Sequence, residues 1–99
     1  MEDNAKLIYG SVDFTMGGNL ANGFWVEPMV LEGIKYDSPS YHQEFFGPIF
    51  TLYKVKDQEE ALKYANRSNF GHGLTIFSES PESCKNLATR ARVGIVSIN

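Results

Sequence analysis

Three short apolar runs in the second half of the chain have the composition of strands. They are rich in β-branched and aromatic residues and cover residues 49–55, 74–77 and 95–98. Two stretches with apolar positions at helical spacing separate them. The predicted order over residues 49–98 is therefore strand, helix, strand, helix, strand, and right-handed crossovers would make the strands parallel. We expect an α/β fold built around this parallel β-α-β-α-β unit.

Both predicted helices have recognisable start signals. Asp57, followed three residues later by Glu60, resembles a capping box and predicts a helix over about residues 58–66. Gly71 lies beyond that helix and is expected to form a left-handed stop. Ser80-Pro81 starts the second helix, because a proline at the first helical position loses no hydrogen bond. One apolar face of this helix is formed by Cys84, Leu87, Ala88 and Ala91.

The first half of the chain is less regular. Residues 5–9 predict a short strand, and residues 10–23 form a glycine- and asparagine-rich connector. Residues 24–31 are again strand-like, but Pro28 removes a backbone donor and places the edge or end of the strand near itself. Residues 33–42 are predicted to form a loop. We therefore expect short strands and loops before the regular unit.

Composition limits the class of protein. The chain has 99 residues with a net charge of −3 and no cluster of Lys and Arg, which argues against a nucleic-acid partner. Its length suits one small domain or a piece of a larger one. It has one cysteine and no apolar run long enough to cross a membrane, and its first residues are acidic. We expect a soluble, cytoplasmic protein that has no membrane partner.

Several residues invite a chemical interpretation that the pattern does not support. Cys84 is the only thiol, but it lies on the apolar face of a predicted helix with no base beside it, so we expect a small buried hydrophobe. His42 and His72 have no partners at ligand spacing, and no metal site is expected. Residues 71–73 read Gly-His-Gly, but they follow a helix, whereas a dinucleotide loop precedes one.

The strongest candidate for function is the segment Glu44-Phe45-Phe46-Gly47-Pro48, directly before a strand. A carboxylate can accept hydrogen bonds from two vicinal hydroxyls, as acidic residues do with the ribose of a dinucleotide. We expect Phe45 and Phe46 to wall Glu44 with apolar surface, and Gly47 to let another group approach the backbone. The competing interpretations are a solvated loop acid for Glu44 and simple core packing for Phe46.

This segment resembles the Glu-x-Phe-Gly-Pro motif of the aldehyde dehydrogenase superfamily. Further motifs of that family are matched in the same order along the chain, with Met29 in place of the usual Thr and His72 in place of the usual Leu. They are the Gly-aromatic-x-x-x-Pro segment in residues 23–31, the Glu-Ala…Ala-Asn…Phe-Gly run in residues 60–71 and the Gly-x-Val-x-x-Asn strand in residues 94–99. The pattern is most similar to bacterial succinate-semialdehyde dehydrogenases.

The resemblance implies that residues 1–99 are a single partial domain, the later part of a catalytic domain. The parent would be a homo-oligomer that oxidises a small aldehyde to a carboxylic acid with NAD or NADP, through a cysteine nucleophile. That cysteine belongs to a segment preceding Met1, so the isolated chain is predicted to be inactive. Glu44 and Phe46 are expected to contact the cofactor, no residue here is expected to be catalytic, and Asn99 is expected to give at most structural support.

An alternative of a different class stays open. The chain would then be a free-standing, non-catalytic α/β module for binding or self-association, which pairs through an exposed sheet edge. The two interpretations differ in solution behaviour, because a module should form a compact, stable oligomer, whereas a fragment should aggregate or unfold in part.

Overall fold

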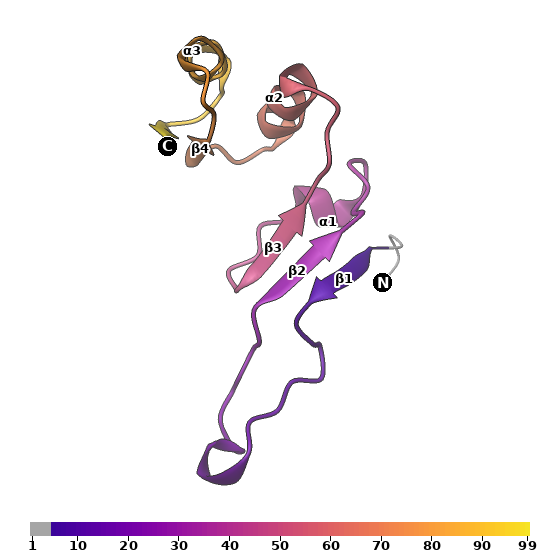
Figure 1. Cartoon of the computed structure of the whole chain (residues 1–99). Helices are drawn as coiled ribbons and strands as arrows, with labels where there is room; N and C mark the ends of the chain where they lie inside the picture. Colours follow the sequence, from indigo (N-terminus) through magenta and orange to yellow (C-terminus); the bar gives the residue numbers. More distant parts are fainter. Residues whose placement is uncertain (1–4) are drawn as a thin grey trace. The chain divides into compact units, whose positions relative to one another are not determined.

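The computed structural model describes residues 5–99, which form a mixed α/β structure (Figure 1). The chain divides into two compact units, the first ending at Tyr53 and the second running from Lys54 to Asn99. In chain order the elements are β1 (Lys6–Tyr9), the 3-10 helix η1 (Gly18–Leu20), β2 (Met29–Glu32), α1 (Pro39–His42), β3 (Ile49–Leu52), α2 (Gln58–Arg67), β4 (Gly73–Ile76), α3 (Pro81–Arg90) and β5 (Ile95–Ile98). The predicted α/β class is confirmed.

The first unit is built on a three-stranded sheet with β2 at its centre (Figure 1). β1 pairs with β2 in antiparallel fashion, and β2 pairs with β3 in parallel from Met29 opposite Ile49 to Glu32 opposite Leu52. Gly10 follows β1 with a φ of 89°, and a Cβ at that position would lie 2.4 Å from the carbonyl oxygen of Pro28. The chain therefore needs glycine where it leaves the sheet.

The predicted strand over residues 24–31 is wrong in its first part, because β2 begins only at Met29. Pro28 cannot donate to a ladder, and the strand starts directly after it, as its position at a strand end requires. The preceding residues are instead part of the connector. There the indole Nε1 of Trp25 donates a hydrogen bond of 2.8 Å to the carbonyl oxygen of Leu20, next to η1.

The predicted order of elements from β3 to β5 is confirmed, but the pairing of β3 is not the expected one. β4 and β5 form a parallel pair, whereas β3 forms its ladder with β2 of the first unit. The prediction treated residues 33–42 as a loop and so missed α1, which makes β2-α1-β3 a crossover unit of its own. Two parallel strands that are neighbours in a sheet need a crossover connection between them. Because α1 provides this connection, β3 forms its backbone hydrogen bonds with β2 and not with β4.

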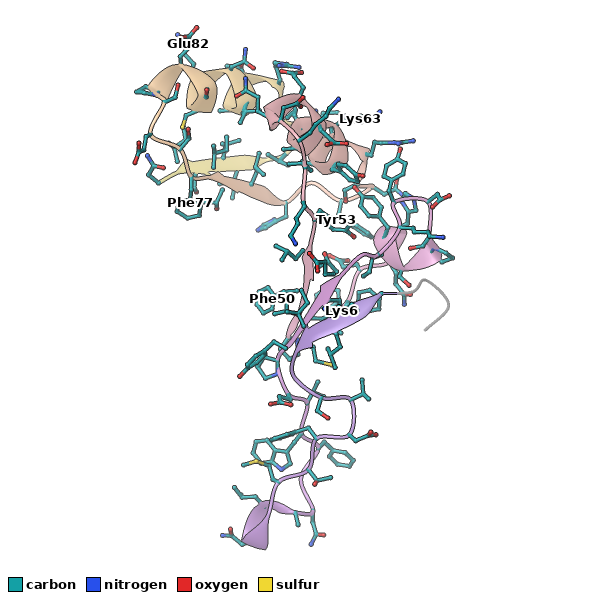
Figure 2. All side chains as sticks on the ribbon, turned by 45° about the vertical axis from the view of Figure 1, so that its right-hand side comes forward. Lys6, Phe50, Tyr53, Lys63, Phe77 and Glu82 are labelled. Carbon is teal, nitrogen blue, oxygen red and sulfur yellow. The ribbon has the colours of Figure 1, made fainter. Side chains whose placement is uncertain are left out.

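The second unit packs α2 and α3 onto one face of the β4–β5 pair. Leu62, Ile76 and Cys84 are 5%, 7% and 3% exposed and form its core, so the expected burial of Cys84 is confirmed. Phe77 projects from the opposite face of the sheet and is 79% exposed (Figure 2). The two helices therefore cover one face of this small sheet.

Both predicted helix starts are confirmed at α2 and α3. The Asp57 carboxylate accepts a 2.8 Å hydrogen bond from the backbone N–H of Glu60. The Glu60 side chain accepts in turn from the N–H of Lys56, one residue before the position that a standard capping box uses. At α3, the Ser80 hydroxyl accepts from the N–H of Ser83, and Pro81 takes the first helical position.

The left-handed stop predicted at Gly71 is wrong. α2 ends at Arg67 with Ser68 at its C-cap, and Gly71 does not have a positive φ. Glycine is needed there for a different reason, because a Cβ would lie 2.7 Å from the carbonyl oxygen of Arg92. Two backbone segments meet at this point, and the N–H of Gly94 donates a 2.9 Å hydrogen bond to the carbonyl of Gly71.

The side chain of Asn66 links the end of α2 to the turn after α3. Its Nδ2 donates a 2.9 Å hydrogen bond to the carbonyl of Arg90, and its Oδ1 accepts a 2.7 Å hydrogen bond from the N–H of Arg92. An amide side chain can hold a donor and an acceptor of the backbone in this way, as a neighbouring strand would. Asn66 therefore fixes the position of one helix against the exit of the other.

Replacing Asn66 by Ala is expected to lower the free energy of unfolding by about 1–2 kcal/mol, since two hydrogen bonds of about 1 kcal/mol each are lost. Urea denaturation followed by circular dichroism measures this change. Asn69→Ala is the matched control, because Asn69 is exposed, and its replacement should change stability little. Equal effects of the two substitutions would contradict the assigned role.

Candidate functional site

The segment that contains Glu44 and Phe46 is a short loop with both ends held. Before it, α1 is a single turn whose first N–H groups are capped, since the Ser38 hydroxyl accepts from the N–H of Tyr41. After it, the carbonyl of Pro48 accepts a 2.9 Å hydrogen bond from the N–H of Met29 at the start of β2. Residues 43–47 therefore span the short distance between α1 and β3.

Glu44 and Phe46 both face solvent in this loop. Phe46 is 97% exposed, Phe45 is 44% exposed, and Glu44 is also exposed. Within residues 5–99 the two rings therefore do not bury the Glu44 carboxylate. A Cβ placed on Gly47 would meet nothing within 4 Å, so the space beside the loop backbone is open.

The residue types in this loop suit a ligand that has both hydroxyls and a flat ring. A carboxylate accepts up to about four hydrogen bonds and binds two neighbouring hydroxyls well. An exposed phenyl ring offers a large apolar face, which gains stability when a planar group covers it. An acid and an aromatic residue two positions apart can therefore bind the polar and the flat part of one molecule.

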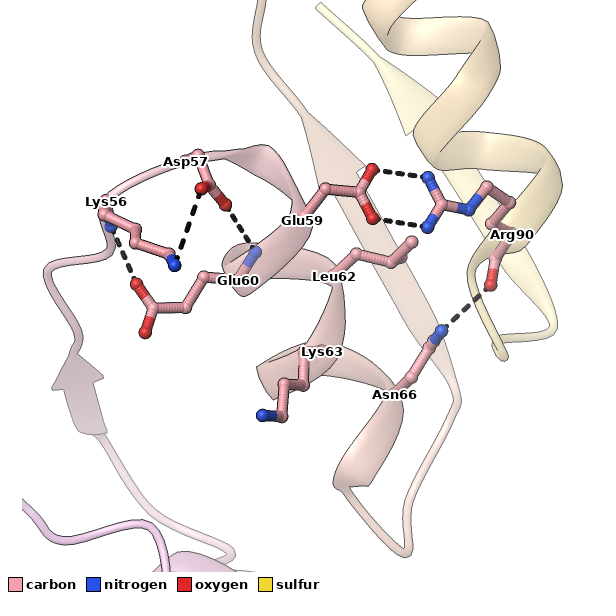
Figure 3. Close-up of a pocket in the computed structure, with 8 residues that line it drawn as sticks. All are labelled: Lys56, Asp57, Glu59, Glu60, Leu62, Lys63, Asn66 and Arg90. Atoms are coloured by element: carbon pink, nitrogen blue, oxygen red, sulfur yellow. Dashed lines mark hydrogen bonds and ion pairs between the residues drawn. The ribbon is translucent and has the colours of Figure 1, made fainter.

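A polar hollow of about 430 Å³ lies in the second unit, between α2 and α3 (Figure 3). Two ion pairs join charged groups around it. Arg90 donates two hydrogen bonds of 2.6 and 2.5 Å to the carboxylate of Glu59, and Lys56 lies 4.0 Å from Asp57. Three cations face three carboxylates here, so the hollow offers no excess charge for an anionic cofactor. Its lining residues are Lys56, Asp57, Glu59, Glu60, Leu62, Lys63, Asn66 and Arg90.

The hydrogen bonds from Arg90 lower the pKa of Glu59, and those to Glu59 raise the pKa of Arg90. A carboxylate with a lowered pKa stabilises the fold above its unfolded pKa, and this contribution disappears as the pH falls through the folded value. Both side chains are about half exposed, so the contribution to stability is small.

We expect Glu59 to titrate below the ordinary range of glutamate when its carboxyl carbon is followed by NMR. In Arg90→Ala, the titration should return to that range. High salt should also weaken the shift, since it screens exposed charges. A titration that is unchanged in Arg90→Ala would show that the ion pair is not formed in solution.

The remaining candidates have structural environments. Cys84 is buried in the core, and His42 and His72 are both exposed. Within residues 5–99, no group of three His, Cys, Asp or Glu side chains could hold a metal ion. In the same part of the chain, no helix is long and apolar enough to cross a membrane.

The side chain of Asn99 forms hydrogen bonds with the backbone that follows β4. Its Oδ1 accepts a 3.0 Å hydrogen bond from the N–H of Ser78, and its Nδ2 donates a 3.2 Å hydrogen bond to the carbonyl of the same residue. Its backbone N–H donates to the carbonyl of Ile76, and its φ of 56° lies in the left-handed region that asparagine tolerates. Asn99 therefore extends the β4–β5 pair beyond its last residues. The sequence indicated structural support but not this pairing.

The aldehyde dehydrogenase family model matches residues 1–99, the whole chain. The chain belongs to the aldehyde dehydrogenase family. The succinate-semialdehyde dehydrogenase [NADP(+)] of Deinococcus radiodurans is 39% identical over 77 residues, or 78% of this chain. The betaine aldehyde dehydrogenase of Bacillus subtilis is 34% identical over 99 residues, or 100% of this chain. The resemblance noted in the sequence is confirmed, including its succinate-semialdehyde dehydrogenase-like character.

Solved aldehyde dehydrogenase structures share the fold. The succinic semialdehyde dehydrogenase of Streptococcus pyogenes, in complex with NADP+, matches 98% of this chain with a TM-score of 0.82 and 38% identity. The aldehyde dehydrogenase of Bartonella henselae matches 98% with a TM-score of 0.88 and 28% identity. In the other direction, this chain spans only 16% of the Deinococcus radiodurans enzyme and 20% of the Streptococcus pyogenes chain.

Proposed function

We propose that this chain supplies part of the cofactor site of an NAD(P)-dependent aldehyde dehydrogenase. Glu44 accepts hydrogen bonds from the hydroxyls of the nicotinamide ribose, and Phe46 packs against the ribose or the nicotinamide. The observation that carries this proposal is the paired exposure of an acid and an aromatic ring in a loop held at both ends. NAD or NADP, when bound, accepts the hydride that the aldehyde gives up.

The contribution of these residues is positional. Two hydrogen bonds from the ribose hydroxyls to one carboxylate fix the ribose against rotation, and the phenyl ring limits how far the attached flat group can tilt. Holding reacting groups in the correct geometry provides a large part of enzymatic rate enhancement, and small displacements are costly. Glu44 and Phe46 thereby hold the cofactor ready without taking part in bond making or breaking.

The rest of the catalytic apparatus is proposed to lie outside these residues. Residues 1–99 are then one partial domain, the later part of the catalytic domain of a cytoplasmic homo-oligomer. Large exposed apolar side chains support this, since Phe24 is 105% and Phe77 is 79% exposed, and monomeric domains seldom leave extended apolar surface uncovered. An apolar hollow of about 230 Å³ between α2 and β4 also marks an incompletely covered core.

The proposed reaction is the oxidation of a small aldehyde to a carboxylic acid. Succinate semialdehyde is the first substrate to test, because two of the similar proteins are succinate-semialdehyde dehydrogenases. The full-length enzyme should produce NADPH or NADH from it, as the absorbance of the reduced cofactor records. The isolated 99-residue chain should produce none, because a covalent mechanism fails without its nucleophile.

Turnover by the pure 99-residue chain would contradict the partial-domain proposal. Absence of turnover by the full-length protein with a panel of aldehydes and both cofactors would contradict the proposed reaction. The 99-residue chain could instead form a compact, stable oligomer, with no protein product longer than 99 residues made from the gene. The binding or self-association module is then the better account.

A further inference from the structure

We infer that Tyr41 is a positioning residue for Glu44, acting through a cluster of aromatic rings around α1. The inference rests on the proposed function, since it assumes that Glu44 contacts the cofactor. The aromatic cluster consists of Tyr36, Tyr41, His42 and Tyr53. None of these residues lies in the Glu-x-Phe-Gly-Pro motif. The cluster is therefore a support for the loop that is separate from the motif itself.

Tyr41 makes edge-to-face contacts with rings from two other segments of the first unit. Its ring centroid lies 5.4 Å from that of Tyr36 at an interplanar angle of 62°, and 5.7 Å from that of Tyr53 at 78°. These separations and angles are within the preferred range for aromatic pairs. Tyr36 precedes α1 and Tyr53 follows β3, so one ring joins the helix to segments on both sides of the Glu44 loop.

This anchoring is needed because α1 is too short to hold itself in place. It spans four residues, Pro39–His42, and an isolated single turn is not stable in water. The Ser38 cap closes its first turn, and Ile34, which precedes it, is 6% exposed and anchors the chain in the core of the unit. The aromatic cluster connects α1 to Tyr53, the residue directly after β3.

The position of Glu44 follows directly from that of α1. Glu44 lies three residues after Tyr41, and the residue at the helix end, Gln43, is already extended with ψ of 134°. At the other end, the backbone is fixed where Pro48 accepts from Met29. Only His42 and Gln43 separate Tyr41 from Glu44, so we expect a shift of α1 to be passed on to the Glu44 backbone.

The test is a double-mutant cycle in the full-length enzyme, with kcat and KM measured for the cofactor. Tyr41→Ala should lower kcat/KM by about 10- to 100-fold, the scale expected when a contact is displaced by about 1 Å. Tyr41→Phe retains the ring and should stay within about twofold of wild type. In the Glu44→Gln background, Tyr41→Ala should have little further effect, because the contact that it positions is already lost.

The outcomes separate the inference from the proposed function. If Glu44→Gln itself changes nothing, the proposed function fails. If Glu44→Gln is impaired but Tyr41→Ala is silent, or lowers activity by the same factor in both backgrounds, only the positioning role of Tyr41 is overturned. Should Tyr41→Ala fail to fold, Tyr36→Ala replaces it in the same cycle, since it removes a flanking ring and leaves Tyr41 in place.

Discussion

Replacing Glu44 by Gln in the full-length enzyme is expected to lower kcat/KM for the nicotinamide cofactor by about 10- to 100-fold. A hydrogen bond to a charged acceptor contributes about 1.5–3 kcal/mol, and each 1.4 kcal/mol is a factor of ten. Gln keeps the size of the side chain but loses the charge and one acceptor oxygen. We expect kcat to fall as well, because hydride transfer depends on the orientation that the ribose contact maintains.

Glu79→Gln is the matched control for this experiment. Glu79 is also an exposed glutamate, but it belongs to the second unit and has no part in the proposed site. Its replacement removes the same charge from the enzyme and should leave the kinetics within about twofold of wild type. Glu44→Gln kinetics equal to those of Glu79→Gln would remove Glu44 from the cofactor site.

Replacing Leu62 by Ala in the full-length enzyme is expected to reduce the free energy of unfolding by about 2–5 kcal/mol. Leu62 is a residue of α2 and is 5% exposed. Its side chain belongs to the small core that α2 and α3 form with the sheet. Total stabilities of small domains are about 5–15 kcal/mol, so this loss would remove a large part of the stability.

Lys63→Ala is the control for the core, since Lys63 is the next residue of α2 and is exposed. This variant shortens an exposed side chain of the same helix, so it shows the effect of side-chain truncation without loss of buried surface. The free energy of unfolding should change by no more than about 0.5 kcal/mol. Urea denaturation followed by circular dichroism measures both variants. A Leu62→Ala loss no larger than that of Lys63→Ala would contradict the packing of α2 on the sheet.

The helices of the second half could be predicted from the sequence because their signals are local. Asp57 and Ser80 cap the helices that they precede, and Pro81 takes the first position of α3. The apolar face that includes Cys84 has helical spacing, so its burial was predictable. Such features are contained within a few residues, and sequence reasoning reads them directly.

The pairing of strands could not be predicted in the same way. The sequences of β3 and β4 both predict strands, but neither sequence indicates which strand will be its pairing partner in a sheet. The choice depends on α1, whose four residues are too few for a periodic apolar pattern. The sequence Ser38-Pro39 offered a start signal for α1, and it was the one local clue to the β2-α1-β3 crossover.

The candidate site also combines features that are local in the sequence with contacts that are not. Glu44 and Phe46 were found because they belong to a continuous motif, and their role in cofactor binding stays a prediction. The groups that hold the structure around them come from distant positions. Tyr41, for example, contacts Tyr53, which lies twelve positions further along the chain. Contacts of this kind leave no periodic trace in the sequence.

The most direct test of the account is a crystal structure of the full-length enzyme with NADP+ bound. We predict that the Glu44 carboxylate oxygens lie within about 2.5–3.2 Å of the hydroxyl oxygens of the nicotinamide ribose, as hydrogen bonds require, with the Phe46 ring against the ribose or the nicotinamide. An ordered cofactor whose ribose is held by other residues, with Glu44 turned to solvent, would contradict the account.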